Sequence, residues 1–286
     1  MIKIHIVLKN NEKGKKNKER KIRKEKCFND IGVCCTMKEN LLFYDAYEEF
    51  YKMAATSETF RLFCIDAYGA DFSQDGFSDV KQIDMIIPFI KNSDAHVLDI
   101  GCGNGKMIKY LGDKTGAHVY GFDYSDNAIM QANINTDSVD FRVGVMGKIE
   151  YPKESFDVIV AMDSIYFATD MAIFLKQIRE WLKPGGVLFV AYQEGDVMDK
   201  TENENTTVFA ETLRTIGWEY EVKNISEDSY NMLVKKRDVA LSYKNKFDAE
   251  GNGMWGKMLI DQTDYVLGGK EEYLKHLARY IYVCRK

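Results

Sequence analysis

The chain has 286 residues, of which 45% are hydrophobic and 29% charged, and its formal net charge is −5. This length and composition are typical of a globular protein with one elaborated domain or two small ones. No run approaches the ~18 apolar residues that span a bilayer, and the six cysteines form no Cys-x-x-Cys pair and have no histidine at zinc spacing. These features exclude a membrane protein, a disulfide framework and a metal site, and they predict a cytoplasmic protein with reduced thiols.

Residues 1–36 differ in charge from the rest of the chain. They carry nine Lys and two Arg against four acidic residues, and residues 13–26 show almost no apolar periodicity. We expect a basic, disordered tail, which is either a solvated arm or translated sequence ahead of a start at Met37. The remaining chain is acidic, so nucleic acid is not an expected partner, because phosphate binding requires clusters of Lys and Arg.

Residues 37–92 predict an N-terminal helical cap made of helix, loop and helix. An aromatic stripe at helical spacing marks the first helix: Phe43, Tyr47, Phe50, Tyr51 and Ala54. Residues 71–78 have the composition of a loop. Ser78 is a candidate N-cap for a second helix, whose apolar face repeats at helical spacing: Val80, Ile83, Ile87 and Ile90.

The stretch from Val97 to Lys106 predicts a buried strand, a glycine turn and the start of a helix. Asp99 lies in the strand, and three alternate glycines follow it: Gly101, Gly103 and Gly105. Glycines let the backbone turn sharply and approach a ligand closely, because no Cβ intervenes. Cys102 is expected to contribute its small size and its backbone. The spacing differs from the Gly-x-Gly-x-x-Gly of dinucleotide-binding enzymes.

A second strand, over residues 117–122, ends at Asp123. A carboxylate at the tip of this strand can accept hydrogen bonds from both hydroxyls of a ribose, and such charged bonds are worth ~1.5 to 3 kcal/mol each. Tyr124 is a candidate to lie against an adenine face, and Ser125 is a candidate cap for a helix through Ile134. Asp123 therefore predicts a ligand that contains ribose.

Two more strands and a characteristic turn follow. Residues 139–143 predict the third strand, and residues 155–162, which begin Ser-Phe-Asp, predict a buried fourth strand. An amphipathic helix beginning near Ile173 then ends in the turn Leu182-Lys183-Pro184-Gly185-Gly186. Proline stops the helix and the glycines reverse the chain into a strand over residues 187–192.

Four features of the chain, in this order and spacing, resemble the class I S-adenosylmethionine-dependent methyltransferases. They are the glycine turn, Asp123, the Phe156-Asp157 pair and the Leu-Lys-Pro-Gly-Gly turn. The resemblance implies an α/β doubly wound fold: a mainly parallel seven-stranded sheet, its last strand antiparallel, with helices on both faces. It implies S-adenosyl-L-methionine as cofactor and the following binding residues: Asp99, Gly101, Cys102, Gly103, Gly105, Asp123, Tyr124, Val145, Met146 and Ala161. The family often has an acidic residue where Val145 stands, so a hydrogen bond to adenine worth about 1 to 2 kcal/mol is missing here.

The C-terminal third predicts further elements of this domain. Residues 209–216 predict a helix, residues 217–222 a strand, and residues 278–284 the last strand. Between them, residues 229–267 predict two or more helices that pack over the ligand edge of the sheet. We therefore expect a cofactor-binding domain over residues 93–286 with a helical insertion at about 226–270.

The expected ligand site lies outside the carboxyl ends of the strands. Methyl transfer is an in-line displacement in which the protein mainly aligns the acceptor and excludes water, and a base is needed only if the acceptor loses a proton. The candidate bases are Asp163, Tyr166 and Glu194, whereas the four histidines are expected elsewhere. The candidate acceptor-binding residues are Tyr44, Tyr51, Gln74, Tyr166 and Tyr192. Gln74 is included because, in several enzymes that the resemblance covers, a segment in its position covers the methionine end of the cofactor.

Aromatic walls and carboxylates favour a cationic acceptor through cation–π contacts. The sequence thus predicts a methyltransferase that acts on a small molecule, with an amine as the favoured acceptor. Two alternatives stay open. A non-catalytic cofactor-binding or interaction protein would explain the departure at Val145, and an NAD-dependent dehydrogenase would share Asp123 but conflicts with the glycine spacing. The sequence predicts neither the identity of the acceptor nor the oligomeric state.

Overall fold

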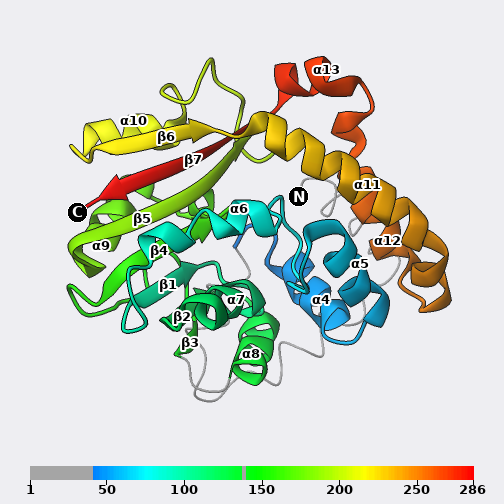
Figure 1. Cartoon of the computed structure of the whole chain (residues 1–286), viewed down its shortest axis with the longest axis horizontal. Coiled ribbons are helices and arrows are strands. Elements are labelled where there is room, and N and C mark those ends of the chain that lie inside the picture. Colours follow the sequence, from blue (N-terminus) through cyan, green and yellow to red (C-terminus); the bar gives the residue numbers. More distant parts are fainter. Residues whose placement is uncertain (1–40, 137–139) are drawn as a thin grey trace, which may run out of the picture.

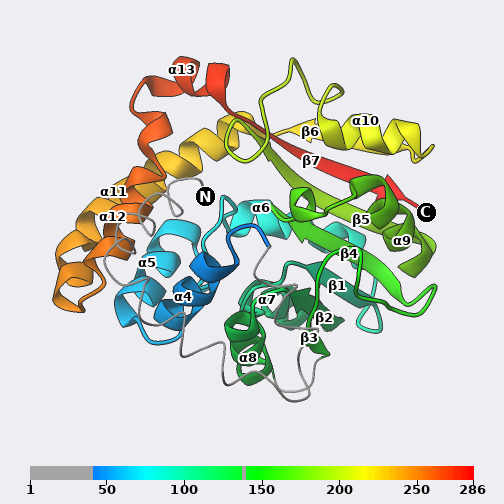
Figure 2. The same ribbon diagram turned by 180° about the vertical axis from the view of Figure 1, so that it is seen from behind.

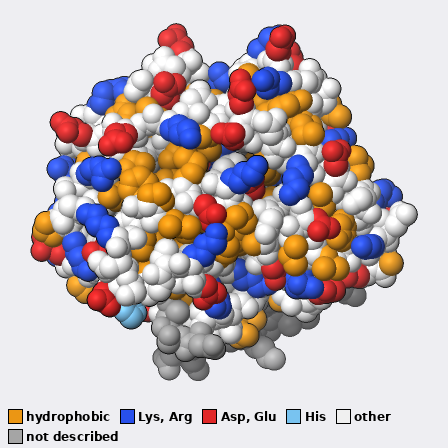
Figure 3. Space-filling model, viewed as in Figure 1, with side chains coloured by type: hydrophobic (Ala, Val, Ile, Leu, Met, Phe, Trp, Pro, Cys, Tyr) orange, Lys and Arg blue, Asp and Glu red, His pale blue; other side chains and the backbone are white. Residues whose placement is uncertain are grey.

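The computed structural model describes residues 41–136 and 140–286. The basic tail expected over residues 1–36 lies outside these ranges. Among the helices that are described, none combines the length and hydropathy needed to cross a membrane. On the face shown in Figure 3, basic and acidic side chains are interspersed rather than gathered into patches of one sign.

A sheet of seven strands forms the centre of the described structure (Figure 1). Its strands are β1 (His96–Ile100), β2 (His118–Asp123), β3 (Phe141–Val143), β4 (Phe156–Met162), β5 (Leu182–Glu194), β6 (Tyr220–Asn224) and β7 (Ala278–Arg285). They lie in the order β3-β2-β1-β4-β5-β7-β6. Only β7 runs antiparallel to its neighbours, β5 and β6. The predicted fold class is confirmed.

Helices cover both faces of the sheet (Figures 1 and 2). On one face, α9 (Met171–Trp181) and α10 (Val208–Thr215) pack against alternate residues of β4 and β5, such as Ile159 and Val190. On the other face, α6 (Val80–Asp84), α7 (Lys106–Thr115) and α8 (Asp126–Asn135) pack against the intervening residues, such as Val160 and Phe189. This alternation gives the sheet two separate cores.

The cap helices, as we call α4 (Tyr44–Ala54), α5 (Glu58–Tyr68), α11 (Ser226–Ala249) and α12 (Gly253–Asp261), gather at one end of the sheet, on the right in Figure 1. This is the end at which the parallel strands terminate. α13 (Gly269–His276) leads from them into β7. Short 3-10 helices occupy Ile87–Phe89, Ile165–Phe167 and Asp264–Val266. Segments from both ends of the chain thus meet at the carboxyl edge of the sheet.

The structure corrects two predicted elements. The helix expected through Ile90 ends at Asp84, because Pro88 has no amide to donate and the chain continues as a 3-10 turn. The N-cap of α6 is Asp79, whose side chain accepts from the Gln82 amide, and not Ser78. The strand predicted from residue 217 begins at Tyr220, because Gly217 has a left-handed φ of 65°.

Glu250, which follows α11, joins the C-terminal part of the cap to α5. Its carboxylate accepts hydrogen bonds from the hydroxyl of Ser57 at 2.6 Å and from the amide and hydroxyl of Thr59 at 2.8 and 2.6 Å. Burial raises the pKa of Glu250, but these hydrogen bonds outweigh it and hold the pKa below its ordinary value. The ionised carboxylate therefore stabilises the packing of α11 on α5.

We expect Glu250→Ala to lower the free energy of unfolding by about 1 kcal/mol in urea denaturation at pH 7, because two buried hydroxyls and an amide lose their acceptor. The loss should shrink as the pH falls through the lowered pKa of Glu250, since protonation removes the same interaction from the parent protein. The exposed Glu219→Ala variant is the control and should change the value by less than about 0.5 kcal/mol. Equal effects of the two substitutions would contradict this role.

Candidate active site

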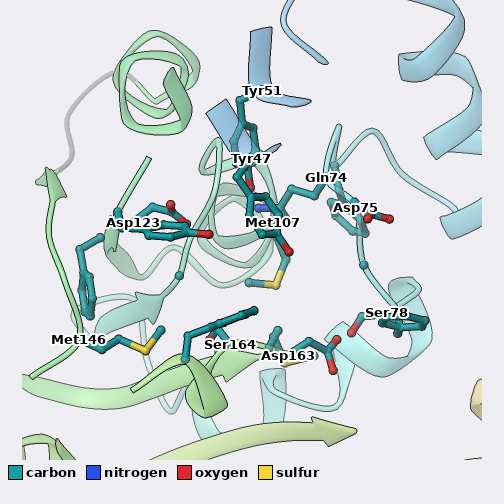
Figure 4. A pocket seen from close by; sticks show the side chains of 18 of the residues that line it. Tyr47, Tyr51, Gln74, Asp75, Ser78, Met107, Asp123, Met146, Asp163 and Ser164 are labelled. Atoms are coloured by element: carbon teal, nitrogen blue, oxygen red, sulfur yellow. The ribbon is translucent and has the colours of Figure 1, made fainter. Parts of the chain in front are cut away.

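A cavity lies at the carboxyl ends of β1, β2 and β4, beneath the cap helices (Figure 4). Eight of the residues predicted for cofactor or acceptor binding, or as bases, line it: Tyr51, Gln74, Gly101, Asp123, Tyr124, Val145, Met146 and Asp163. Figure 4 shows Asp123 and Met146 at one end of the cavity and Asp75, Ser78 and Asp163 at the other. The cavity therefore has two chemically different ends.

The glycine turn lies beneath this cavity, and Gly101 is the one of its three glycines that lines it. Gly101, Gly103 and Gly105 have φ values of 73°, 54° and 75°, all in the left-handed region that favours glycine. A Cβ on Gly103 would lie 2.3 Å from the Tyr51 hydroxyl and 2.6 Å from the Gln74 amide nitrogen. Gln74 also donates to the Cys102 carbonyl at 2.8 Å. Both the backbone angles and the space above the turn thus require glycine.

Asp123 stands at the tip of β2 and faces the cavity. Its two oxygens accept hydrogen bonds from the amides of Gly103 at 3.0 Å and Ser125 at 2.9 Å. Burial raises its pKa to about 6, although these amides oppose the rise. At neutral pH the carboxylate is therefore ionised, and each oxygen keeps a lone pair for a ligand hydroxyl.

Other predicted cofactor residues lie below the turn rather than at the cavity surface. Both carboxyl oxygens of Asp99 are buried and find no partner among the described residues, and burial followed by the charge of Asp123 raises the pKa of Asp99 well above its usual range. Burial likewise raises the pKa of the Cys102 thiol, which packs against Gly121. Gly105 begins α7. Ala161 is buried in the core beneath α9 and α10 and does not line the cavity.

Asp163 dominates the opposite end of the cavity. It follows β4 with a left-handed φ of 56°, a strained conformation for a residue with a Cβ and one that is common at functional sites. One carboxylate oxygen accepts from the Arg279 guanidinium at 2.7 Å, and the other has no hydrogen-bond partner among the described residues. Burial raises the pKa of Asp163. The charge and hydrogen bond of Arg279, the Phe77 amide and the Ser78 hydroxyl only partly oppose this rise.

Two buried cations hold the loop 71–78 against this end of the cavity. The Lys236 ammonium lies 3.3 Å from an Asp75 oxygen, and the Arg279 guanidinium donates to the Ser78 hydroxyl at 2.8 Å. The side chains of both cations are fully buried, and neither of them lines the cavity. The Gln262 side chain also donates to Asp75, at 2.7 Å. The cavity wall therefore presents carboxylates, and the cations stand behind them.

The structure does not bring the remaining predicted residues to the cavity. Alternate residues of β5 point to the same face, so Tyr192 and Glu194 follow Val190 into the core beneath α9 and α10. Glu194 is fully buried and accepts from Thr201, which does not agree with a role as base. Tyr166 packs against Tyr192, and its neighbour Phe167 lines the cavity instead. The Tyr44 hydroxyl donates to Asp126 on the surface.

Several residues that line the cavity or stand behind its wall were not predicted. Asp75 belongs to the predicted loop over residues 71–78, but the amino-acid composition of that loop did not distinguish Asp75 from the neighbouring residues. Arg279 is a basic residue within the apolar strand from Ala278 to Cys284, a pattern that could have marked it. Tyr68 and Lys236 lie in ordinary helical patterns, and only the packing of α5 and α11 brings them to the site.

The family profile described as "Methyltransferase domain" matches residues 91–245. The chain is 35% identical over 128 residues to ubiquinone biosynthesis O-methyltransferase from Bradyrhizobium diazoefficiens, covering 43% of this chain and 46% of that protein. It is 27% identical over 194 residues to phosphoethanolamine N-methyltransferase from Plasmodium falciparum, covering 64% of this chain and 66% of that protein. The chain thus spans less than two thirds of each of these relatives.

Solved structures share the fold. Phosphoethanolamine N-methyltransferase 2 from Haemonchus contortus, in complex with phosphomonomethylethanolamine and S-adenosylhomocysteine, superposes with a TM-score of 0.66 at 20% identity, over 84% of this chain and 60% of that one. The cyclopropane synthase MmaA2 from Mycobacterium tuberculosis gives 0.63 at 15% identity, over 84% of this chain and 98% of that one. At these identities the likeness concerns the fold.

We expect the affinity for S-adenosylhomocysteine to fall about five- to tenfold between pH 7.5 and pH 5, measured by isothermal titration calorimetry. The pKa of Asp123 is about 6. If its ionised form accepts the ribose hydroxyls, protonation competes with binding below that pH.

An Asp123→Asn variant provides the control for this pH dependence. It should bind more weakly than the parent at pH 7.5 and show a flat profile from pH 5 to 7.5, because the titrating group is gone. A profile that keeps its slope in the variant would assign the titration to another group, such as Asp99, and would contradict the role of Asp123.

Proposed function

This chain belongs to the class I S-adenosylmethionine-dependent methyltransferases, and on that premise we propose that it methylates the nitrogen of a small amine. The amine would bind at the end of the cavity where Asp163 lies, and the cofactor at the end where Asp123 lies. Membership of this family decides against the NAD-dependent dehydrogenase.

The charge of the cavity wall carries the proposal. Its charged side chains are all carboxylates, those of Asp75, Asp123 and Asp163, and no Lys or Arg lines it within the described part of the chain. Aromatic rings form much of the remaining wall: Tyr47, Tyr51, Tyr68, Phe72, Phe77 and Phe167. Carboxylates and aromatic faces together favour an ammonium group over an anionic or neutral acceptor.

The residues at the Asp123 end fit the cofactor. Gly101 lies in the wall at this end, and Asp123 offers two acceptors for ribose hydroxyls. Gly144, Val145 and Met146 form the neighbouring wall. When bound, S-adenosylmethionine supplies an electrophilic methyl group that an acceptor lone pair takes in one displacement. Tyr51 and Gln74, which lie over Gly103, help to exclude water from this point.

Asp163 would hold and deprotonate the acceptor. An ammonium ion has no lone pair, so its proton must leave before the nitrogen can attack. The unpartnered oxygen of Asp163 can accept that proton, and burial raises the pKa of this group in the direction that a base needs. Arg279 fixes the other oxygen and thereby the orientation of the carboxyl group.

The named relatives include both an N-methyltransferase and an O-methyltransferase, so relatedness alone does not choose the acceptor atom. A screen with methyl-labelled S-adenosylmethionine against matched amines, phenols and thiols tests the choice. We expect label on amines. Label on phenols or thiols but on no amine would contradict the proposal, and a chain that binds S-adenosylhomocysteine yet labels nothing in a broad metabolite panel would favour the non-catalytic alternative.

We expect Asp163→Asn to lower kcat for the amine acceptor about 100-fold, within the usual range for loss of a general base. The acidic limb of the pH profile of kcat/KM should disappear with it, whereas S-adenosylhomocysteine should bind within twofold of the parent affinity. The exposed Asp199→Asn variant is the control and should keep the parent rate and profile. A variant that keeps its acidic limb would assign the base to another residue.

A further inference from the structure

We propose that Tyr68 forms a second polar subsite in the cavity and donates a hydrogen bond to an oxygen atom of the acceptor. The acceptor is then a small molecule with two functional groups, an amine and an oxygen-bearing group such as a hydroxyl, carboxylate or phosphate. This inference rests on the proposed amine methylation and specifies its substrate class.

The Tyr68 hydroxyl is a buried donor that lacks an acceptor. Tyr68 is the last residue of α5, it is 3% exposed, and it lines the cavity. No acceptor for its hydroxyl proton exists among the described residues, and the backbone group that lowers its pKa, the Gly76 amide, is itself a donor. Tyr151 and Tyr192 also have unpartnered hydroxyls, but neither of them lines the cavity. Because buried tyrosine hydroxyls usually find a partner, an unpaired one at a cavity wall indicates a ligand atom there.

The surroundings of Tyr68 fix the direction of its hydroxyl. The ring packs edge-on against Phe63, with the ring centroids 5.9 Å apart, and the Lys236 ammonium lies 5.8 Å from the centre of the Tyr68 ring. α5 ends here with Gly69 in the left-handed conformation at φ 90°. Tyr68 is therefore held by packing and needs no rearrangement to meet a ligand.

The Tyr68 hydroxyl favours an oxygen over a second ammonium group, because it is a donor without an acceptor. The three polar contacts of the Lys236 ammonium are long, at 3.1 Å to Gln262, 3.3 Å to Asp75 and 3.4 Å to the Gly76 carbonyl. Charge-assisted hydrogen bonds of this kind are typically 2.7–2.9 Å. Lys236 is paired with Asp75, and the Tyr68 hydroxyl is the donor of this corner that has no acceptor, so an electron-rich oxygen suits it.

Phe77 connects this corner to the amine end. The Lys236 ammonium lies 5.5 Å from the centre of the Phe77 ring, and the Arg279 guanidinium, which holds Asp163, lies 5.9 Å from it. Lys236, which lies near the Tyr68 ring, and Arg279, which holds Asp163, therefore both lie near one aromatic ring. A molecule with a nitrogen and an oxygen separated by a few carbons can reach both Tyr68 and Asp163 from a position against Phe77.

The experiment compares acceptors of equal length with and without the oxygen. The parent protein and a Tyr68→Phe variant are assayed with methyl-labelled cofactor on propylamine, 3-amino-1-propanol and β-alanine, and on ethylamine, ethanolamine and phosphoethanolamine. We expect the parent to favour at least one oxygen-bearing amine over its alkylamine tenfold or more in kcat/KM. The Tyr68→Phe variant should reduce that ratio at least fivefold, mainly by raising KM for the oxygen-bearing amine. The oxygen-bearing amine whose ratio falls most identifies the oxygen group that Tyr68 binds.

The Tyr243→Phe variant is the matched control, because it also removes a tyrosine hydroxyl where α5 packs against α11. The Tyr243 hydroxyl donates to Asp66, and Tyr243 does not line the cavity. It should leave the ratio unchanged, and both variants should keep the parent affinity for S-adenosylhomocysteine. An unchanged ratio in Tyr68→Phe, or a parent protein that does not discriminate between the paired amines, would overturn the subsite alone. Absence of transfer to every amine would overturn the proposed function as well.

Discussion

The hydrogen bond from the Gly103 amide to the Asp123 carboxylate joins the ends of β1 and β2, and the end of the cavity where Asp123 lies depends on it. The bond can form because the chain leaves β1 through a turn whose glycines all have positive φ values. A side chain on Gly103 would also collide with Tyr51 and Gln74, which lie over the turn. One constraint, the absence of a Cβ, thus shapes the floor of the cavity, positions the Asp123 carboxylate and allows the cap to close above it.

The acceptor end is built on a different principle. Asp75 and Asp163 come from segments far apart in the sequence, and each faces the cavity with a fully buried cation behind it. Burying these pairs is costly unless each charge is compensated, and removing one partner of a buried pair typically destabilises a protein by about 3 to 5 kcal/mol. The ion pairs of Asp75 with Lys236 and of Asp163 with Arg279 therefore stabilise one arrangement of the loop 71–78, α11 and β7. As a result, the carboxylates face an aromatic cavity, where they suit a cationic ligand.

Local patterns predicted the sheet and the cofactor end. The glycine turn and Asp123 are each contiguous in the chain, so their geometry follows from neighbouring residues. The turn predicted at Leu182 to Gly186 is instead the first part of β5, where the register with β4 shifts. Local patterns did not predict which side chains line the cavity where this depends on packing between distant segments. Tyr192 and Glu194 were placed correctly on β5 but point to the other face of the sheet, and strand alternation alone does not say which face carries the ligand. Tyr68, Lys236 and Arg279 meet only because α5, α11 and β7 converge.

A crystal structure of the protein with S-adenosylhomocysteine and an amine that it methylates would test the central claim most directly. We expect both ribose hydroxyls to lie within hydrogen-bond distance of Asp123. We expect the amine nitrogen to contact the oxygen of Asp163 that Arg279 does not hold, between that carboxylate and the cofactor sulfur. A cofactor bound away from Asp123, or an amine nitrogen that contacts neither Asp163 nor Asp75, would contradict it.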